Sequence, residues 1–214
     1  MRFLITAGPT REPLDPVRYI TNRSSGKMGY AIAEAAIEAG HEVVLISGPV
    51  TLDPPDAAKV ISVSTADEMY DAVHQRIGDC DVLVMSAAVA DYKPATVSKE
   101  KIKKAEARRS LELVPTSDIL ASLPRDRKFL VVGFAAETEN VEANAIKKLR
   151  AKNCNLIVAN DARVAMESDE NEVTVLFRDG EKKKLSRAPK KFIARELIKI
   201  FENVCENCLT KKIM

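Results

Sequence analysis

A run of anion-binding residue types precedes a predicted helix near the amino terminus. The segment 22–27, NRSSGK, leads directly into an apolar-periodic stretch that begins at Met28. Hydroxyl groups, a flexible glycine, a lysine and the free N–H groups of a helix start can together cradle a phosphate or another anion. The same residues also fit an ordinary serine N-cap after a polar loop. The local sequence leaves both interpretations open.

Two groups of lysines add positive charge at other points of the chain. Lys148 and Lys152 lie four residues apart on a predicted helix, so their ammonium groups share one face. A second group lies in the loop 91–109, at Lys99, Lys101, Lys103 and Lys104. A solvated lysine face is the ordinary alternative. Because both groups follow predicted strand ends, where open α/β sheets bind ligands, we favour contacts with an anionic ligand.

Several common catalytic motifs are missing. The first predicted strand is not followed by the G-x-G-x-x-G of dinucleotide-binding proteins, and Walker A fails because Thr21 and Met28 replace its Gly and Ser/Thr. None of the four tyrosines has a lysine four residues further on, which argues against a short-chain dehydrogenase. No Ser-His-Asp or Cys-His arrangement is legible, and we expect His41 and His74 at the surface. Any catalysis must therefore depend on positioning and on charge stabilisation of phosphates.

The four cysteines do not predict a metal site. Cys205 and Cys208 are the only close pair, and no second pair or nearby histidine completes a zinc site. The pair lies late in a predicted terminal helix, whereas a thioredoxin-like motif would follow a strand. We therefore expect incidental, reduced thiols, which suit a cytoplasmic protein.

Composition limits the class of protein. The 214 residues, 46% hydrophobic and 30% charged, suit one α/β domain over 1–214 and exclude a disordered or collagen-like chain. Lys and Arg total 33 against 31 Asp and Glu, so no basic excess suggests a nucleic-acid partner. No apolar run reaches the roughly 18 to 20 residues that span a bilayer, and no signal peptide is legible. We expect a soluble cytoplasmic protein.

Apolar runs alternate with helical patterns along most of the chain. Strands are predicted at 3–7, 42–47, 59–64, 81–87, 129–135 and 155–160, and helices at 28–39, 66–77, 117–123 and 141–152. Several strands are continuously apolar, as in sheets buried on both faces. The pattern predicts a doubly wound, Rossmann-like, mostly parallel sheet. A β-hairpin at about 172–186 and a terminal helix from about Pro189 complete it. The long loops 8–26 and 91–109 are expected to be functional.

Blocks of sequence spread over nearly the whole chain resemble the phosphopantothenoylcysteine synthetase family of coenzyme A biosynthesis. The blocks occur in the family's order, at 6–13, 15–29, 87–92, 101–104, 133–138 and 159–161. The resemblance implies a two-step ligation. The carboxylate of 4′-phosphopantothenate attacks the α-phosphate of CTP and releases pyrophosphate. The amine of L-cysteine then attacks the acyl-cytidylate and releases CMP. ATP in place of CTP stays open.

The resemblance also implies roles for residues at matching positions. Asn22 matches the asparagine at the acyl centre, Arg18 suits the phosphopantothenate end, and Lys101 matches a loop lysine that neutralises charge. Arg23 falls where the family varies and receives no role. The implied nucleotide-binding residues are Ser24, Ser25, Gly26, Lys27, Met85, Ser86, Ala87, Asp91, Lys101, Thr116, Ser117, Asp118, Ile119, Phe134, Lys148 and Lys152, with Ala87 also near the substrate. Thr116-Ser117 replaces the family's frequent Asn-Pro.

Cofactors and partners are implied in the same way. Mg²⁺ should accompany CTP, held mainly by phosphate oxygens and water, with no protein ligand assigned. The family is homodimeric and is often fused to a flavin-dependent phosphopantothenoylcysteine decarboxylase. The chain begins at the synthetase's first strand, so we expect no flavin on it. The alternative function is a non-catalytic nucleotide-sensing module on the same fold, which would not need Asn22 and Lys101.

Overall fold

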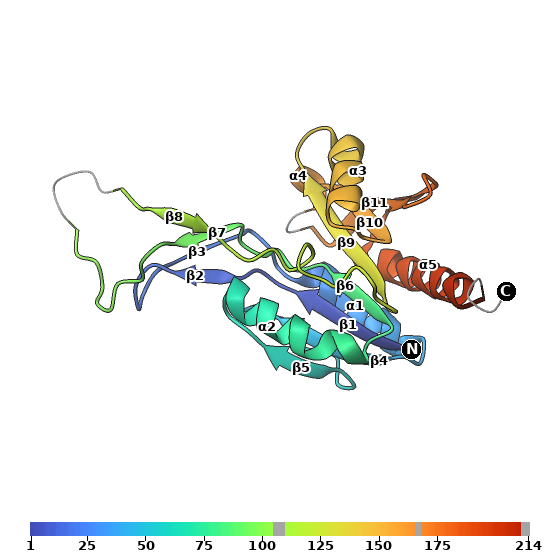
Figure 1. The fold of residues 1–214 in the computed structure, drawn as a ribbon, viewed down its shortest axis with the longest axis horizontal. Coiled ribbons are helices and arrows are strands. Elements are labelled where there is room, and N and C mark those ends of the chain that lie inside the picture. Colours follow the sequence, from blue (N-terminus) through green and yellow to red (C-terminus); the bar gives the residue numbers. More distant parts are fainter. Residues whose placement is uncertain (105–109, 166–167, 211–214) are drawn as a thin grey trace.

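The main body of the protein is one eight-stranded sheet with helices on both faces. The computed structural model describes residues 1–104, 110–165 and 168–210, without the side chains of 164–165 and 207–210. Six strands run parallel: β1 (Arg2–Ala7), β4 (Glu42–Ser47), β5 (Lys59–Ser62), β6 (Val82–Met85), β9 (Leu130–Glu137) and β10 (Leu156–Asp161). Numbered along the chain, they lie in the spatial order 3-2-1-4-5-6. The predicted doubly wound, mostly parallel sheet is thereby confirmed (Figure 1).

The predicted carboxy-terminal hairpin extends this sheet. The strands β11 (Glu170–Phe177) and β12 (Lys182–Pro189) pair with each other, and β11 pairs antiparallel with β10. Gly180 in the connecting turn has a φ of 97°, which glycine adopts without strain. The predicted terminal helix follows at once as α5 (Lys190–Thr210). The sheet therefore ends in an antiparallel edge.

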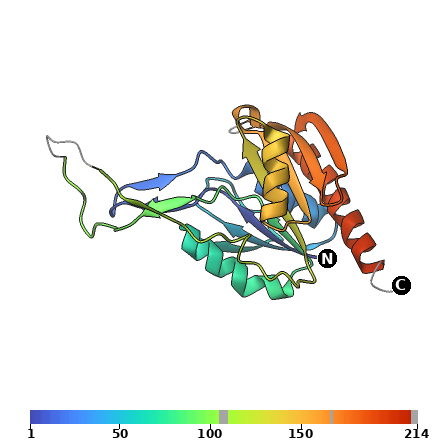
Figure 2. The same ribbon diagram turned by 45° about the horizontal axis from the view of Figure 1, so that its top comes forward.

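Alternate side chains of the strands pack against helices on opposite faces. Phe3 and Ile5 of β1 join α1 (Lys27–Glu38) and α5 in one buried cluster. Leu4, between them, belongs to a second cluster with α2 (Ala66–Arg76) and α3 (Val141–Ala151). Both faces are covered, as the continuously apolar strands require. Figure 2 shows α2 and α3 on the near side of the sheet. The short helices η1 (Ile77–Asp79) and α4 (Ala162–Ala165) follow α2 and β10.

Two small hairpins form an arm that projects from the body. In the first predicted loop, β2 (Arg11–Pro13) pairs with β3 (Tyr19–Thr21); in the second, β7 (Tyr92–Pro94) pairs with β8 (Leu113–Pro115). The two sheets lie beside each other and extend away from the main sheet (Figure 1). Both segments had been predicted as loops. Strands of three residues are too short for an alternating pattern to show. Residues 105–109 of the second loop lie outside the described residues.

One predicted helix is wrong. Residues 117–123 form turns instead, in which Asp118 accepts a hydrogen bond from the Ala121 N–H at 2.9 Å. Pro115 and Pro124 bound the segment, and proline disfavours helical geometry in the residue before it. The stretch between them is also too short for a stable helix. In the part of the chain that the structure describes, no helix is long and apolar enough to cross a membrane.

Candidate functional site

A cleft of about 720 Å³ opens beside the carboxyl ends of β1 and β6. The strand order reverses between these two strands, which is where open α/β sheets leave a crevice for ligands. The start of α1, the segment after β6 and the turn 115–120 line the cleft, and residues of β9, α3, β10 and β11 complete it. The fold therefore brings together segments from nearly the whole length of the sequence.

The amino terminus of α1 is left open towards this cleft. The helix has Gly26 as N-cap, at a φ of 76°, and no side chain caps it. Ser24 Oγ instead accepts from the Gly26 N–H at 3.4 Å. The interpretation of this segment as a serine N-cap is therefore wrong. The first N–H groups of α1 form the positive end of the cleft, where an anion is favoured. The Lys27 side chain also lines the cleft, and its Nζ forms an ion pair with Asp169 at 2.6 Å.

Close packing brings the start of α1 onto the end of β1. A Cβ added at Gly29 would lie 2.6 Å from both Ala7 Cβ and Ser86 Oγ. Real Cβ atoms do not approach so closely, so only glycine lets the helix start meet β1 and the segment after β6. This packing sets where the free N–H groups of α1 lie in the cleft.

Asn22 lies in the wall of the cleft, beside the segment that follows β6. Its Nδ2 donates to the carbonyl oxygens of Ala88 and Val89, both at 3.1 Å. Two bonds use both N–H groups of the amide, and among the described residues no donor reaches Oδ1. The side chain is thus fixed with its oxygen available to accept a hydrogen bond.

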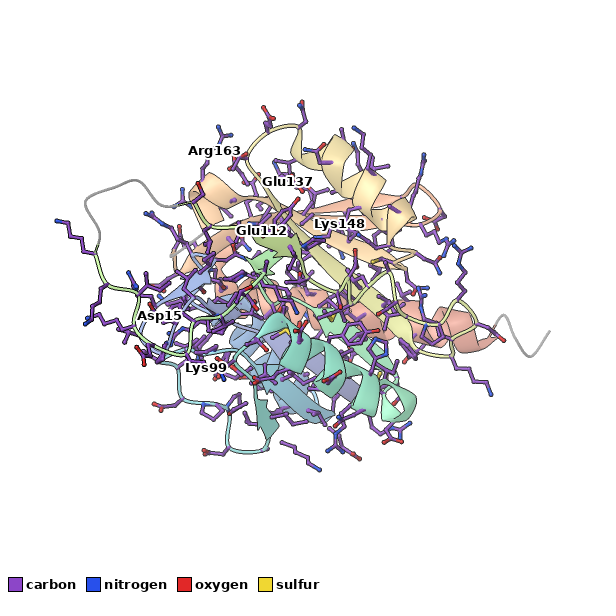
Figure 3. The ribbon with its side chains drawn as sticks, turned by 60° about the vertical axis from the view of Figure 1, so that its left-hand side comes forward. Asp15, Lys99, Glu112, Glu137, Lys148 and Arg163 are labelled. Atoms are coloured by element: carbon purple, nitrogen blue, oxygen red, sulfur yellow. The ribbon has the colours of Figure 1, made fainter. Side chains whose placement is uncertain are left out.

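The other end of the cleft carries Lys148 of α3 and Lys152, the C-cap residue of the same helix, which we call together the lysines of α3. Lys148 Nζ donates to the Phe134 carbonyl at 2.7 Å, and Lys152 forms an ion pair with Asp118. Burial acts to raise the pKa of Asp118, but the hydrogen bonds from Lys152 and the Ala121 N–H outweigh it, so this pKa lies below its usual value. Figure 3 shows Lys148 on α3, near the centre of the molecule. Both ammonium groups are therefore turned towards the cleft rather than freely solvated.

Most of the predicted site residues line this one cleft. They are Asn22, Ser24, Ser25, Gly26, Lys27, Met85, Ser86, Ala87, Asp91, Thr116, Ser117, Asp118, Ile119, Phe134, Lys148 and Lys152. Arg23 lines it as well. Asn160, Asn171 and Lys190 also line it but were not predicted. Asn160 stands in a block of the family resemblance, while Asn171 and Lys190 come from the hairpin and the terminal helix, which carry no motif.

Arg18 and Lys101 do not line the cleft. Arg18 pairs with Asp15 in the turn between β2 and β3, and its Nη2 also donates to the Ile102 carbonyl at 2.7 Å. Lys101 immediately precedes Ile102. Figure 3 shows Asp15 and Lys99 near each other on the arm, away from Lys148. The structure therefore brings Arg18 and Lys101 together, but at a place separate from the other predicted residues.

The histidines and cysteines offer no second reactive centre among the described residues. His41 is not at the surface as predicted: its side chain is 11% exposed, stacks on Phe3 and meets Glu202 at 2.8 Å. Burial raises the pKa of Cys80 to about 12 and that of Cys154 to about 11, so neither thiol is a ready nucleophile. The Cys208 side chain lies outside the described residues. Within the described chain, no three His, Cys, Asp or Glu side chains cluster as metal ligands.

Comparison with known proteins identifies relatives of the whole chain. Residues 1–204 match the family described as the DNA/pantothenate metabolism flavoprotein C-terminal domain. The Coenzyme A biosynthesis bifunctional protein CoaBC of Bacillus subtilis is 48% identical over 200 residues, which cover 91% of this chain and 49% of that protein. The protein of the same name from Escherichia coli K12 is 47% identical over 190 residues, covering 85% and 47%. The chain spans about half the length of these relatives.

Solved structures agree with the sequence comparison. The crystal structure of the C-terminal domain of a CoaBC protein is similar, with a TM-score of 0.83 at 48% identity and 96% of both chains covered. A Cab2 variant in complex with phosphopantothenate-cysteine has a TM-score of 0.84, covering all of this chain and 89% of that one. Its 16% identity makes it evidence for the fold alone. By its sequence and its fold, the chain belongs to the DNA/pantothenate metabolism flavoprotein C-terminal domain family.

Proposed function

We propose that the chain is a phosphopantothenate–cysteine ligase of coenzyme A biosynthesis. It joins 4′-phosphopantothenate to L-cysteine through an acyl-cytidylate and releases pyrophosphate and CMP. The names of the relatives, which match over about half their length, support the pathway. The observation that carries the proposal is a single cleft that combines the uncapped start of α1, the fixed amide of Asn22 and the lysines of α3. The product is one that a decarboxylase could process next.

Each part of the cleft suits a different part of this reaction. The N–H groups at the start of α1 and Lys27 can bind phosphate oxygens of the nucleotide. Lys148 and Lys152 add positive charge beside Phe134 and can bind the rest of the nucleotide. Asn22 Oδ1 can accept a hydrogen bond from the amine of L-cysteine as it approaches the acyl carbon. The chain would thus act by positioning and by charge stabilisation.

The direct test is a measurement of pyrophosphate release. The assay uses CTP or ATP, with and without 4′-phosphopantothenate and L-cysteine. We expect release that requires 4′-phosphopantothenate and is faster with CTP. CMP and the ligated product should appear once L-cysteine is added. Nucleotide binding without pyrophosphate release under any condition would instead identify a non-catalytic nucleotide-sensing module.

The described residues do not offer a cage for a metal ion. Asp91 and Asp118 line the cleft, and Asp118 already pairs with Lys152. We therefore assign no protein ligand to a metal and derive no step through one. Mg²⁺ that arrived with the triphosphate would be held by phosphate oxygens and water.

Replacement of Lys148 or Lys152 by alanine should weaken CTP binding by roughly tenfold, because each removes a charge-assisted contact. The free energy of unfolding should change little, since both ammonium groups lie at the cleft and not in the core. Calorimetric titration with CTP measures the affinity. Lys147→Ala is the matched control, because Lys147 is exposed on the same helix. An unchanged CTP affinity in both variants would return the two lysines to a solvated surface role.

The purified protein should carry no flavin and bind no nicotinamide. The reason is that the glycine fingerprint of dinucleotide-binding proteins is missing, and that the family resemblance of the described blocks is to the synthetase and not to the flavin-dependent decarboxylase. An absorbance spectrum and a titration with NADH and NADPH are sufficient measurements. A bound flavin band, or saturable binding of either nicotinamide, would contradict this expectation.

We also propose that the protein is a homodimer in which the arm contacts a second copy. Most of the large apolar side chains that the structure leaves exposed lie on this arm, at Val17, Tyr19, Tyr92, Val97, Leu111 and Leu113. Apolar groups gathered on a projecting segment indicate a protein interface. Because Arg18 and Lys101 lie on the arm and outside their own cleft, a second copy could bring them to its partner's cleft.

The mass of the particle in solution tests the dimer. Sedimentation equilibrium of the native protein should give twice the chain mass, and Leu113→Glu, which places a charge on the arm, should give a monomer. Phe192→Glu is the matched control, since Phe192 is exposed on α5, outside the arm. A native monomer, or a dimer that Leu113→Glu leaves intact, would remove the arm from the interface.

A further inference from the structure

Asp15 is a buried carboxylate at the tip of the β2–β3 hairpin. The residue is only 3% exposed. Its Oδ1 accepts from the N–H groups of Val17 and Arg18, both at 2.9 Å, which closes the hairpin turn. Its Oδ2 accepts from the Arg18 guanidinium and, at 3.1 Å, from the N–H of Ile102. The hydrogen bond from Arg18 holds the pKa of Asp15 below its usual value, so the carboxylate stays ionised.

Asp15 and Arg18 both hydrogen-bond the backbone of Ile102, and we call this arrangement the clamp. The Ile102 N–H donates to Asp15, and its carbonyl accepts from Arg18 Nη2 at 2.7 Å. The Ser98 N–H donates to the Leu14 carbonyl at 3.0 Å, which attaches the other end of the same segment to the hairpin. The segment 98–102 is therefore fixed to the hairpin tip at both ends, at Ser98 through the Leu14 carbonyl and at Ile102 through Asp15 and Arg18.

We propose that Asp15 is a positioning residue that holds Arg18 and Lys101 in one fixed unit for the ligation. Lys101 directly precedes the clamped Ile102, so its backbone has the same anchor as Arg18. Arg18 gives Nε and Nη2 to the clamp, and among the described residues Nη1 has no hydrogen-bond partner. Nη1 can therefore bind an anionic group of the substrate. Two cations held at a fixed separation suit a substrate and an intermediate that both carry phosphate. The inference rests on the ligase function proposed above.

Asp15→Asn tests the clamp with little change in shape. The amide oxygen can still close the turn, but the amide nitrogen that replaces Oδ2 cannot accept from Arg18 or Ile102. Hydrogen exchange should then show at least about tenfold faster exchange at the Ile102 N–H. Asp56→Asn, at an exposed carboxylate after β4, is the matched control and should leave that exchange unchanged. Native protection of Ile102 in Asp15→Asn would overturn the clamp.

A double-mutant cycle with Lys101→Ala separates positioning from simple structural support. Asp15→Asn alone should lower the ligation rate about tenfold and leave the CTP dissociation constant within twofold, because the clamp lies outside the cleft. In the Lys101→Ala background, the same change should cost clearly less than tenfold, since the lysine it positions is gone and only its effect through Arg18 remains. A tenfold loss in both backgrounds would show that Asp15 does not act through Lys101 and would overturn the proposal.

Two further measurements keep the proposal testable if a variant does not fold or if the protein is not a ligase. If thermal denaturation shows that Asp15→Asn is unfolded, Ile102→Pro takes its place in the double-mutant cycle, with the ligation rate as the readout. This change deletes the N–H that donates to Asp15 Oδ2 and leaves the two turn bonds to Oδ1 in place. If the native protein forms no ligated product, the proposed function is wrong. The exchange of Ile102 still decides whether the clamp exists, so the two failures are distinguishable.

Discussion

Asn22→Ala is expected to bind CTP with nearly native affinity and to lose about 10²–10³ in ligation rate, the usual cost of removing one group that contacts the reacting centre. In the structure, both N–H groups of the Asn22 amide bond the Ala88 and Val89 carbonyls, which leaves Oδ1 as the atom for a ligand. Alanine removes that atom and leaves the start of α1 and the lysines of α3 in place. The loss should therefore fall on the step in which the amine attacks the acyl-cytidylate.

Rapid-quench experiments with labelled 4′-phosphopantothenate can separate the two half-reactions. Without L-cysteine, the Asn22→Ala variant should accumulate the intermediate, and addition of L-cysteine should consume it slowly. Thermal denaturation establishes that the variant is folded, and titration establishes that CTP still binds. Ligation at the native rate would show that the assignment of Asn22 to the acyl centre is wrong.

Lys101→Ala should impair the other half-reaction, slowing formation of the intermediate about 10²-fold. Charge accumulates at phosphorus as the carboxylate attacks, and the ammonium group screens it. CTP affinity should fall much less than this rate, because Lys101 does not line the cleft of its own chain and, in the dimer proposed above, would act on the charge that develops in the partner's cleft. Lys99→Ala is the matched control on the same segment and should keep the native rate. If the intermediate forms at the native rate in Lys101→Ala, the lysine has no part in this step.

The central sheet could be predicted because the continuous apolar runs of its strands indicate that the strands are buried. The predicted strand at 42–47 matches β4 in both bounds. The strand at 3–7 differs from β1 by one residue at its start, and the strand at 155–160 is shifted by one residue at both ends relative to β10. Continuous apolar runs need burial on both faces, which a parallel sheet between helices supplies. In these strands the local sequence pattern and the buried environment in the folded protein favour the same structure.

The arm and the turn at 117–123 could not be predicted, because their structure depends on partners far away in the sequence. Strands of three residues carry no pattern, and β8 pairs with β7 across about twenty residues of chain. A helix was predicted at 117–123, but in the structure Ile119 and Leu123 are buried in a non-helical segment, and Ile119 lines the cleft. Pro115 and Pro124 prevent the helix that the apolar spacing of this segment favours.

The candidate site was predictable where a motif carried it and not elsewhere. The segment 22–27 and the lysines of α3 were expected together, and they line one cleft. Asn171 and Lys190 also line that cleft, because the antiparallel edge of the sheet lies beside the start of α1. No local sequence pattern indicates this long-range contact. The sequence also did not show that Arg18 lies on the arm while Asn22 lies in the cleft. The two residues are only four positions apart, yet this length of chain is enough to run from the arm to the cleft.

The open start of α1 limits how this end of the helix can be stabilised. A capping side chain commonly stabilises a helix by about 1 kcal/mol relative to alanine, but by only a few tenths relative to glycine. Gly26, the N-cap residue, has a φ of 76°, and an added Cβ would lie 2.8 Å from Val50 Cγ1, so a capping side chain there would be strained. An aspartate at position 26 would also bring a negative charge to the place where phosphate is expected. Such a variant should melt at a lower temperature and bind nucleotide less tightly, so the same glycine that leaves this helix end open also keeps it from being stabilised by a cap.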